Sequence, residues 1–212
     1  MKPQIIAHRG WSGRYPENTL AAIRAAIRLG VDRVEIDVQE TRDGQLVVFH
    51  DYRLDRIYGV HKRVRDARRR ELPRAPTLGD VLRLRFPLLI EIKGADGAKV
   101  AREIERYGMT RRVIVFSIKP QRMVELYRAN PRIPRFGLAV HSLTTKVPVR
   151  GWGVSRRLVR SAAAARRLRR HGPLFVWTVN NPAEMARLLA WGVDGLITNH
   201  PDRALAVARR PR

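Results

Sequence analysis

Short apolar runs rich in Val, Ile and Phe recur along the whole chain and alternate with amphipathic stretches. Nearly continuous apolar runs are typical of strands that are buried on both faces, as in a parallel sheet covered by helices. The predicted strands are Gln4–Ala7, Arg33–Val38, Leu46–His50, Leu88–Ile92, Val113–Ser117, Arg135–Val140, Leu174–Val179 and Gly195–Thr198. Residues 151–155 are a further strand candidate. This alternation predicts an α/β fold built from consecutive β-α units.

Amphipathic helices are expected between the apolar runs. In residues 19–29 the aliphatic side chains share one helical face, and Gly30 follows where a glycine commonly ends a helix. Either Asn18 or Thr19 can cap the start of this helix. Further helices are predicted at Ala98–Tyr107, Gln121–Ala129, Ser155–His171 and Ala183–Trp191. Roughly eight β-α units in 212 residues predict a compact (β/α)8 TIM barrel.

Two places depart from the regular alternation. The segment between Val38 and Leu46 is short and contains an Asp43-Gly44 turn signal, so no helix is predicted between strands two and three. Residues 52–80 are interpreted as a short insertion after the third strand. Because no internal repeat or low-complexity linker is evident, residues 1–212 are predicted to form a single domain.

The composition bears on where the protein works. No apolar run reaches the ~20 residues that a membrane-spanning helix needs. The first residues do not resemble the apolar core of a secretory signal, and the chain has no cysteine, which agrees with a reducing compartment. We therefore expect a cytoplasmic location.

The net charge of +24 is extreme and would attract polyanions. Only six of the 43 basic residues are lysines, so arginine dominates. Two interpretations stay open: an arginine-rich composition without a function, and weak association with an anionic membrane or nucleic acid through the basic surface. No obligate protein partner is evident.

Charged and titratable side chains gather where four predicted strands end. In a parallel barrel, functional residues lie at the C-terminal ends of the strands. Side chains of a strand alternate between two faces, so residues two apart point the same way. The residues concerned are His8 and Arg9, Glu35 and Asp37, His50 and Asp51, and Glu91 and Lys93. We expect them to meet at one barrel mouth.

Three carboxylates in one barrel mouth would repel each other strongly unless they are neutralised. A hard divalent cation with oxygen ligands, Mg²⁺ or Ca²⁺, fits Glu35, Asp37 and Glu91, whereas zinc usually takes His or Cys ligands. The alternative is that Arg9, Lys93 and other basic residues neutralise the carboxylates. The neighbouring histidines favour the metal site.

His8 and His50 titrate near neutrality, so each can accept or donate a proton at working pH. Arg9 and Lys93 suit an anionic substrate, because a guanidinium group binds phosphate oxygens in a fork. Together with a cation, these groups indicate phosphoester chemistry. Asp51 either orients His50 or faces solvent.

Glu17 lies after the first loop and either reaches the pocket or is a first-turn acid that the helix dipole favours.

Motifs over nearly the whole chain carry a resemblance to a known family. In order, they are IIAHRGWSGRYPENTLAAI, RVEIDVQETRDGQLVVFHDYRLDR, PTLGDVL, LLIEIKG, FVWTVN and GVDGLITNHPD. The chain thereby resembles the glycerophosphodiester phosphodiesterases, most weakly over residues 52–75 and 141–172. The resemblance implies a TIM-barrel enzyme that uses one divalent metal ion to hydrolyse glycerophosphodiesters to glycerol 3-phosphate and an alcohol.

The resemblance also implies roles for single residues. The metal ligands would be Glu35, Asp37 and Glu91, and the acid/base pair would be His8 and His50. The substrate-binding residues would be Arg9, Lys93 and Trp177. In the last case, simple aromatic packing is the alternative.

The chain departs from the family pattern in three places. The insertion after the third strand is short, Asn199 stands where Asp is common, and Ile118 stands where an aromatic residue is common. In such enzymes the inserted region helps to shape the substrate entrance, and Ile118 would alter the pocket wall. Asn199 is interpreted as structural, and none of the three is expected to touch the predicted catalytic set.

Two alternative functions remain. One is hydrolysis of lysophospholipids, of the lysophospholipase D type, at an anionic membrane surface. The other is non-enzymatic nucleic-acid binding, for which no recognition motif is present.

Overall fold

The structure, a computed structural model, describes residues 2–209. Within that range eight parallel strands follow the order β5-β4-β2-β1-β9-β8-β7-β6. They are β1 (Gln4–Ala7), β2 (Arg33–Glu40), β4 (Leu88–Ile92), β5 (Val113–Phe116), β6 (Phe136–Ala139), β7 (Gly151–Ser155), β8 (Leu174–Trp177) and β9 (Gly195–Thr198). A parallel bridge between Val115 and Arg135 joins the two ends of this order. The sheet therefore closes as a barrel, which confirms the predicted TIM barrel.

The third predicted strand is not part of the barrel wall. This strand, β3 (Leu46–Val48), pairs antiparallel with β2, with Val48 opposite Val38. An antiparallel pair needs only a short turn, whereas a parallel pair needs a crossover of a dozen or more residues. The short 41–45 connection therefore forms a hairpin. This confirms the prediction that no helix lies between the second and third strands. The additional candidate at residues 151–155 supplies the missing barrel strand.

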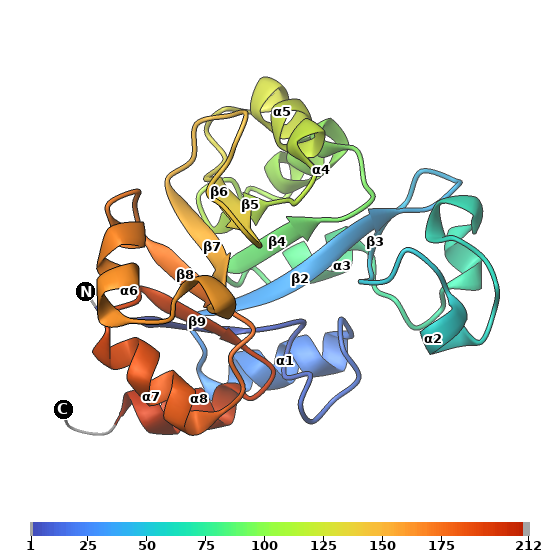
Figure 1. Cartoon of the computed structure of the whole chain (residues 1–212). Coiled ribbons are helices and arrows are strands. Elements are labelled where there is room, and N and C mark those ends of the chain that lie inside the picture. Colours follow the sequence, from blue (N-terminus) through green and yellow to red (C-terminus); the bar gives the residue numbers. More distant parts are fainter. Residues whose placement is uncertain (1, 210–212) are drawn as a thin grey trace.

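Helices surround the barrel (Figure 1). The longer ones are α1 (Leu20–Leu29), α3 (Leu78–Leu82), α4 (Gly97–Arg106), α5 (Pro120–Ala129), α6 (Ala162–Arg169), α7 (Pro182–Ala190) and α8 (Pro201–Ala208). The single helix predicted at Ser155–His171 is wrong. It consists of a 3₁₀ turn, η3 (Arg156–Leu158), and the separate helix α6. The Ser161 hydroxyl accepts a hydrogen bond from the Ala164 N–H at 3.1 Å, and so starts the second helix as an N-cap.

Side chains on the barrel strands alternate between the helix-covered outside and the interior. On β2, Val34, Ile36 and Val38 are fully buried and pack with helix residues in the outer core. Glu35 and Asp37 alternate with them and therefore face inward. Apolar side chains fill the interior below these carboxylates: Ile6, Leu89, Ile114, Phe116, Phe136, Phe175 and Ile197. The polar groups are thus confined to the mouth of a packed barrel.

The segment after β3 forms a small unit beside the barrel mouth, which contains α2 (Asp55–Tyr58), η1 (Val64–Asp66) and η2 (Arg69–Glu71) (Figure 1). It has an apolar cluster of its own, made by Val47, Phe49, Leu54, Val64, Ala67, Leu72 and Ala75. Ile57 and Tyr58 of α2 pack against this cluster. The predicted insertion is therefore a folded element with its own core.

The turn after β1 requires an unusual backbone. Arg9 and Gly10 both have positive φ, 57° and 78°. A side chain on Gly10 would place Cβ 2.6 Å from the backbone carbonyl carbon of Ala22 on α1, so only glycine fits there. Arg9 adopts a left-handed backbone conformation, which is unfavourable for a residue with a side chain. Such backbone strain is typical of functional sites.

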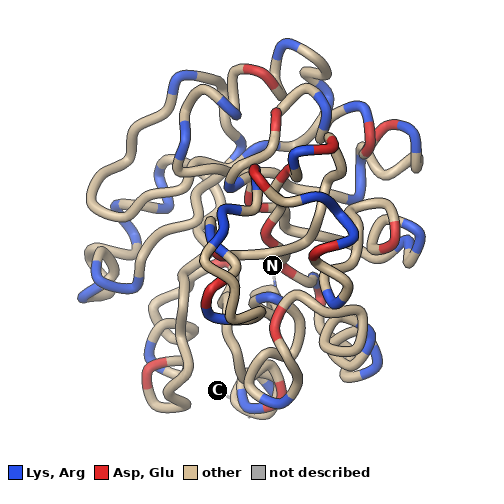
Figure 2. The backbone as a smooth tube through the Cα atoms, turned by 90° about the vertical axis from the view of Figure 1, so that its right-hand side faces the viewer, with Lys and Arg blue, Asp and Glu red and all other residues tan. Residues whose placement is uncertain are grey.

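The basic residues do not form one isolated patch. Figure 2 shows Lys and Arg on segments all around the molecule, with Asp and Glu between them. Among the helices between residues 2 and 209, none has both the length and the apolar character needed to cross a membrane.

Candidate active site

Three inward-facing carboxylates lie together at the barrel mouth, as predicted. Strands β2 and β4 are neighbours, with Asp37 directly opposite Glu91 in the register. Glu35, Asp37 and Glu91 each offer an oxygen within 4.8 Å of the others. Glu35 and Asp37 are 2% and 1% exposed, so water screens their charges poorly.

The electrostatics of this cluster match a cation site. Burial and the neighbouring Asp37 charge raise the pKa of Glu35 well above its usual value, and the same causes raise the pKa of Glu91 to about 7. The buried Oδ1 of Asp37 has no hydrogen-bond partner. A buried carboxylate oxygen without a hydrogen bond and two carboxylates that resist ionisation both fit a hard divalent cation, which would relieve the repulsion.

Basic side chains also approach the carboxylates. The alternative to a metal ion, neutralisation by basic residues, therefore holds in part. Lys93 Nζ lies 3.2 Å from Glu91 Oε1 and 4.0 Å from Asp37 Oδ1. Burial lowers the pKa of Lys93, but the charges of Glu91 and Asp37 outweigh it and raise that pKa above its usual value. Lys93 therefore stays a cation, although it leaves Asp37 Oδ1 without a hydrogen bond.

His8 follows β1 and points into the site. Its Nε2 lies 3.9 Å from Glu35 Oε2. Burial, with the neighbouring Arg9 charge, lowers the pKa of His8 to about 4. The ring is therefore neutral at pH 7, which leaves one nitrogen free to accept a proton.

The structure corrects the expectation for Asn199. Its Oδ1 lies 2.6 Å from His8 Nδ1, so the residue that replaces a common Asp touches the predicted catalytic set. Strands β1 and β9 pair up to Ala7 and Thr198, which places the next residue of each side by side. His8 is thus oriented by a neutral amide, which accepts its Nδ1 proton and leaves Nε2 toward Glu35.

Arg9 connects the first loop to the carboxylates. Its backbone N–H donates to Glu35 Oε2 at 2.9 Å. Its guanidinium Nε lies 3.2 Å from Asp37 Oδ2, and Nη1 donates to Glu17 Oε1 at 3.2 Å. Glu17 therefore contacts the site through Arg9 and is not a first-turn acid, because α1 begins at Leu20.

Asn18 is a site residue that sequence reasoning missed. It has a φ of 58° and is buried, and its Nδ2 donates to Asp37 Oδ2 at 2.9 Å. Thr19, not Asn18, caps α1 by accepting a hydrogen bond from the Ala22 N–H. A signal was present in the PENT motif. It offers two neighbouring cap residues, Asn18 and Thr19, and a helix needs only one, so the other side chain was available for a different contact.

His50 lies in the site, although the strand before it is not a barrel strand. The Phe49 N–H donates to the Asp37 carbonyl at 2.9 Å, and this contact continues the β2–β3 hairpin to the barrel mouth. His50 Nδ1 lies 2.7 Å from Asp51 Oδ1, and its Nε2 lies 3.4 Å from Lys93 Nζ. Asp51 therefore orients His50, one of its two predicted roles.

A pocket of about 210 Å³ lies between these groups and an apolar wall. His8, Arg9, Glu35, His50, Glu91 and Lys93 line one side of it. The other side is formed by Phe116, Ile118, Leu138, Val140, Trp177 and Ile197. Trp177 thus lies at the pocket, as predicted, and its buried Nε1 has no hydrogen-bond partner. Ile118 lies in the wall of this pocket, where its departure from the family pattern was expected to act.

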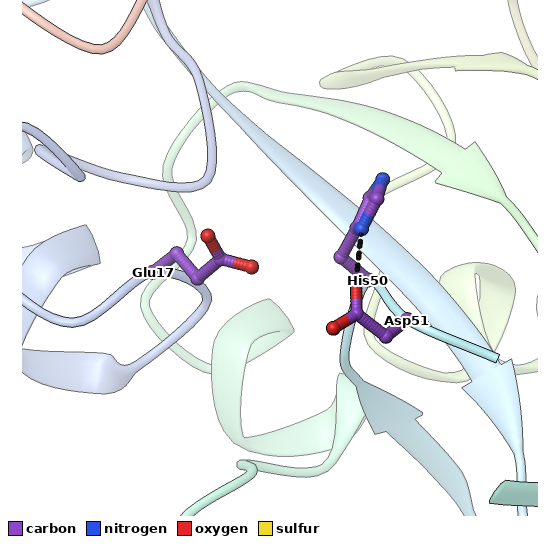
Figure 3. Close-up of side chains that lie close together, drawn as sticks. All are labelled: Glu17, His50 and Asp51. Atoms are coloured by element: carbon purple, nitrogen blue, oxygen red, sulfur yellow. Dashed lines mark hydrogen bonds and ion pairs between the residues drawn. The ribbon is translucent and has the colours of Figure 1, made fainter. Parts of the chain in front are cut away.

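A second group, Glu17, His50 and Asp51, also brings carboxylates and a histidine within 4.8 Å of one another. Figure 3 shows the Glu17 carboxylate pointing across the mouth toward His50 and Asp51. The Arg56 guanidinium pairs with both carboxylates of this group. It supplies the positive charge that the two carboxylates need.

Comparisons with known proteins identify the family of this chain. The Glycerophosphoryl diester phosphodiesterase family model matches residues 8–98 and 90–203. A glycerophosphodiester phosphodiesterase of Caldanaerobacter subterraneus is 30% identical, over 99% of this chain and 99% of its own. The crystal structure of the Agrobacterium tumefaciens enzyme of that name has a TM-score of 0.83 at 26% identity and covers 96% of this chain and 99% of its own.

A third similarity is partial. Over 43% of this chain and 28% of its own length, a lysophospholipase D of Homo sapiens is 41% identical. The family model, by contrast, covers both the strand ends and the carboxylate cluster described above. With its barrel, its HRG turn and its three inward carboxylates, the chain belongs to the glycerophosphoryl diester phosphodiesterase family.

Proposed function

We propose that the protein hydrolyses glycerophosphodiesters to glycerol 3-phosphate and an alcohol, with the help of one divalent metal ion. The observation that carries the proposal is a pocket lined by two carboxylates, two histidines and two cationic side chains, with a third carboxylate, Asp37, grouped with Glu35 and Glu91. The activity named for the relative from Caldanaerobacter subterraneus supports the same reaction.

Glu35, Asp37 and Glu91 would hold the cation, Mg²⁺ or Ca²⁺. When bound, such an ion supplies Lewis-acid polarisation of a phosphoryl oxygen and stabilises the negative charge that develops there. Arg9 and Lys93 add positive charge at the same pocket, and Arg9 is held by Glu17 and Asp37 in a fixed orientation for a phosphate oxygen. Trp177 lines the same pocket, where its ring would contact the rest of the substrate.

The two histidines divide the proton transfers. One takes the proton from the attacking hydroxyl or water oxygen as the new P–O bond forms, and the other gives a proton to the alkoxide as the bond to the alcohol breaks. Their surroundings differ, since His8 contacts the Asn199 amide and His50 contacts the Asp51 carboxylate. A carboxylate, with its full negative charge, stabilises an imidazolium more strongly than a neutral amide oxygen does.

The proposal is tested by assaying the purified protein with several glycerophosphodiesters and a series of divalent metals. We expect release of glycerol 3-phosphate, complete loss of activity in excess EDTA, and recovery on addition of Mg²⁺ or Ca²⁺. Full activity in EDTA would contradict the metal dependence. Absence of glycerol 3-phosphate from every substrate and metal combination would contradict the proposed reaction.

A second candidate substrate class is favoured by the apolar wall of the pocket. Ile118 and Val140 are 47% and 39% exposed at its edge, where an acyl chain could lie. Lysophospholipids would place their phosphodiester at the carboxylates, and the net positive charge of the protein would attract it to an anionic membrane. The lysophospholipase D among the similar proteins supports this candidate.

Parallel assays with lysophosphatidylcholine and glycerophosphocholine separate the two classes. If lysophospholipids are substrates, Ile118→Asp lowers kcat/KM for lysophosphatidylcholine about tenfold or more and changes that for glycerophosphocholine little, because a charge at the edge repels only the acyl chain. Turnover of glycerophosphocholine alone would set this candidate aside.

We also propose a cytoplasmic location, which the absence of cysteine supports. Fractionation of the native host cells tests this proposal. Recovery of the protein outside the cytoplasm would contradict it.

A further inference from the structure

A chain of ion pairs runs through the mouth of the barrel and joins its two sides. Arg9 pairs with Asp37 and with Glu17, and Glu17 in turn accepts a hydrogen bond from Arg56. Arg56 Nε donates to Asp51 Oδ2 at 2.6 Å, and Asp51 Oδ1 lies 2.7 Å from His50 Nδ1. Arg56 is thus the link between the loop that carries Arg9 and the loop that carries His50.

Arg56 is held in place by the inserted unit. It lies on α2, whose neighbouring residues Ile57 and Tyr58 pack against the apolar cluster of that unit. The Tyr58 ring lies 5.9 Å from the ring of Phe49, the residue before His50. The backbone of Arg56 is therefore fixed close to His50.

Within this series of ion pairs, Arg56 keeps the two carboxylates ionised. Burial raises the pKa of both Glu17 and Asp51, but hydrogen bonds from Arg56 outweigh it and hold each pKa below its usual value, with further help from Arg9 at Glu17 and His50 at Asp51. Both carboxylates are therefore ionised and can each accept from two donors. A planar guanidinium is the side chain best suited to bridge two carboxylates.

We propose that Arg56 is a positioning residue for catalysis: it holds Asp51 against His50 and Glu17 against Arg9. The inference rests on the proposed hydrolysis. With Asp51 fixed by Arg56, the His50 ring donates its Nδ1 proton to Asp51 and presents Nε2 to the pocket, near Lys93. Without Arg56, the Asp51 side chain, which is 22% exposed, is free to turn toward water.

The test compares Arg56→Gln and Arg56→Lys with the wild type. We expect Arg56→Gln to lower kcat about tenfold to a hundredfold with KM changed by less than about threefold, because Arg56 orients a proton-transfer group and does not touch the substrate. Arg56→Lys recovers part of kcat, since an ammonium keeps the charge but lacks the fork. Guanidinium ions at non-denaturing concentrations, but not sodium ions, partly rescue Arg56→Ala.

Arg53→Gln is the matched control. Arg53 belongs to the same segment and pairs with Asp55 at 3.0 Å, away from His50, and the two arginines have similar exposure. This variant is expected to keep the wild-type kcat. An unchanged kcat in Arg56→Gln, or an equal loss in Arg53→Gln, would overturn the role of Arg56.

A second readout does not depend on turnover. The ¹⁵N chemical shifts of His50 report which ring nitrogen carries the proton. We expect the Nδ1–H form in the wild type and a mixture of both tautomers in Arg56→Gln. An identical tautomer in both proteins overturns the positioning role, whereas a wild type without activity on any glycerophosphodiester overturns only the proposed function.

Discussion

Replacement of Glu35 by glutamine is expected to abolish turnover and, at the same time, to stabilise the metal-free protein. Glutamine keeps the shape and an oxygen that can accept from the Arg9 N–H, but it removes one of three anionic ligands. Loss of several kcal/mol of transition-state stabilisation corresponds to a fall in kcat of about a thousandfold or more. Steady-state kinetics with glycerophosphocholine at saturating metal measure this fall.

The stability change follows from the sign of the pKa shift. The pKa of Glu35 is raised in the folded protein, so its ionised form is less favourable there than in the unfolded chain. That destabilisation sets in as the pH rises above the usual value of a Glu side chain and is present at pH 7. Removing the charge is therefore expected to raise the free energy of unfolding of the metal-free protein at pH 7, as measured by urea titration in EDTA.

Glu40→Gln is a control on the same strand. Glu40 pairs with Lys99, outside the pocket, so this variant is expected to keep turnover and to lose a little stability. Wild-type turnover in Glu35→Gln would contradict the assignment of Glu35 as a ligand. A lower free energy of unfolding in EDTA would contradict the raised pKa.

Removal of either histidine is the second change with a large expected effect. His8→Ala and His50→Ala each take away one proton transfer and should lower kcat on glycerophosphocholine by about a hundredfold to ten-thousandfold. Both rings are only partly buried, so thermal unfolding should stay close to that of the wild type. His61→Ala is the control, because His61 is 86% exposed and pairs with Asp55.

A substrate with a better leaving group identifies the acid. A glycerophosphodiester of p-nitrophenol releases a phenolate that needs no proton, so the variant that lacks the general acid keeps much more activity on it than on glycerophosphocholine. The variant that lacks the base loses activity on both substrates. Wild-type kcat in both histidine variants with glycerophosphocholine would contradict the acid/base pair.

Several features of the site could be predicted because they depend on local geometry. Glu35 and Asp37 are two residues apart on a strand, and the period of two places both side chains on one face wherever the strand lies. His8 ends an apolar run, and the C-terminal ends of parallel barrel strands share one edge. These rules sufficed to bring the three carboxylates and His8 to one mouth, whereas His50 reaches it on the antiparallel hairpin of β2 and β3.

Other features depend on which elements become neighbours in the barrel. Asn199 is 191 positions from His8 in the chain, and only the pairing of β1 with β9 places its amide against the ring. The direction of β3, by contrast, has a local cause, because the 41–45 connection is too short for the crossover that a parallel pair needs. The sequence leaves Asn18 as one of two cap candidates, and only the contact of its side chain with Asp37 shows that it belongs to the site.

By itself, the sequence determined the fold class, the edge of the barrel that carries the chemistry and the charged groups that meet there. Strand periodicity and β-α alternation depend on residues that are close in the sequence, so they can be recognised without knowledge of distant contacts. Only the tertiary structure decided the partners of those groups: Asn199 for His8, Asn18 for Asp37, and Arg56 for both Glu17 and Asp51. Hydrogen bonds and ion pairs form only between atoms a few ångströms apart in space. The number of residues between two side chains in the sequence does not show whether they come that close.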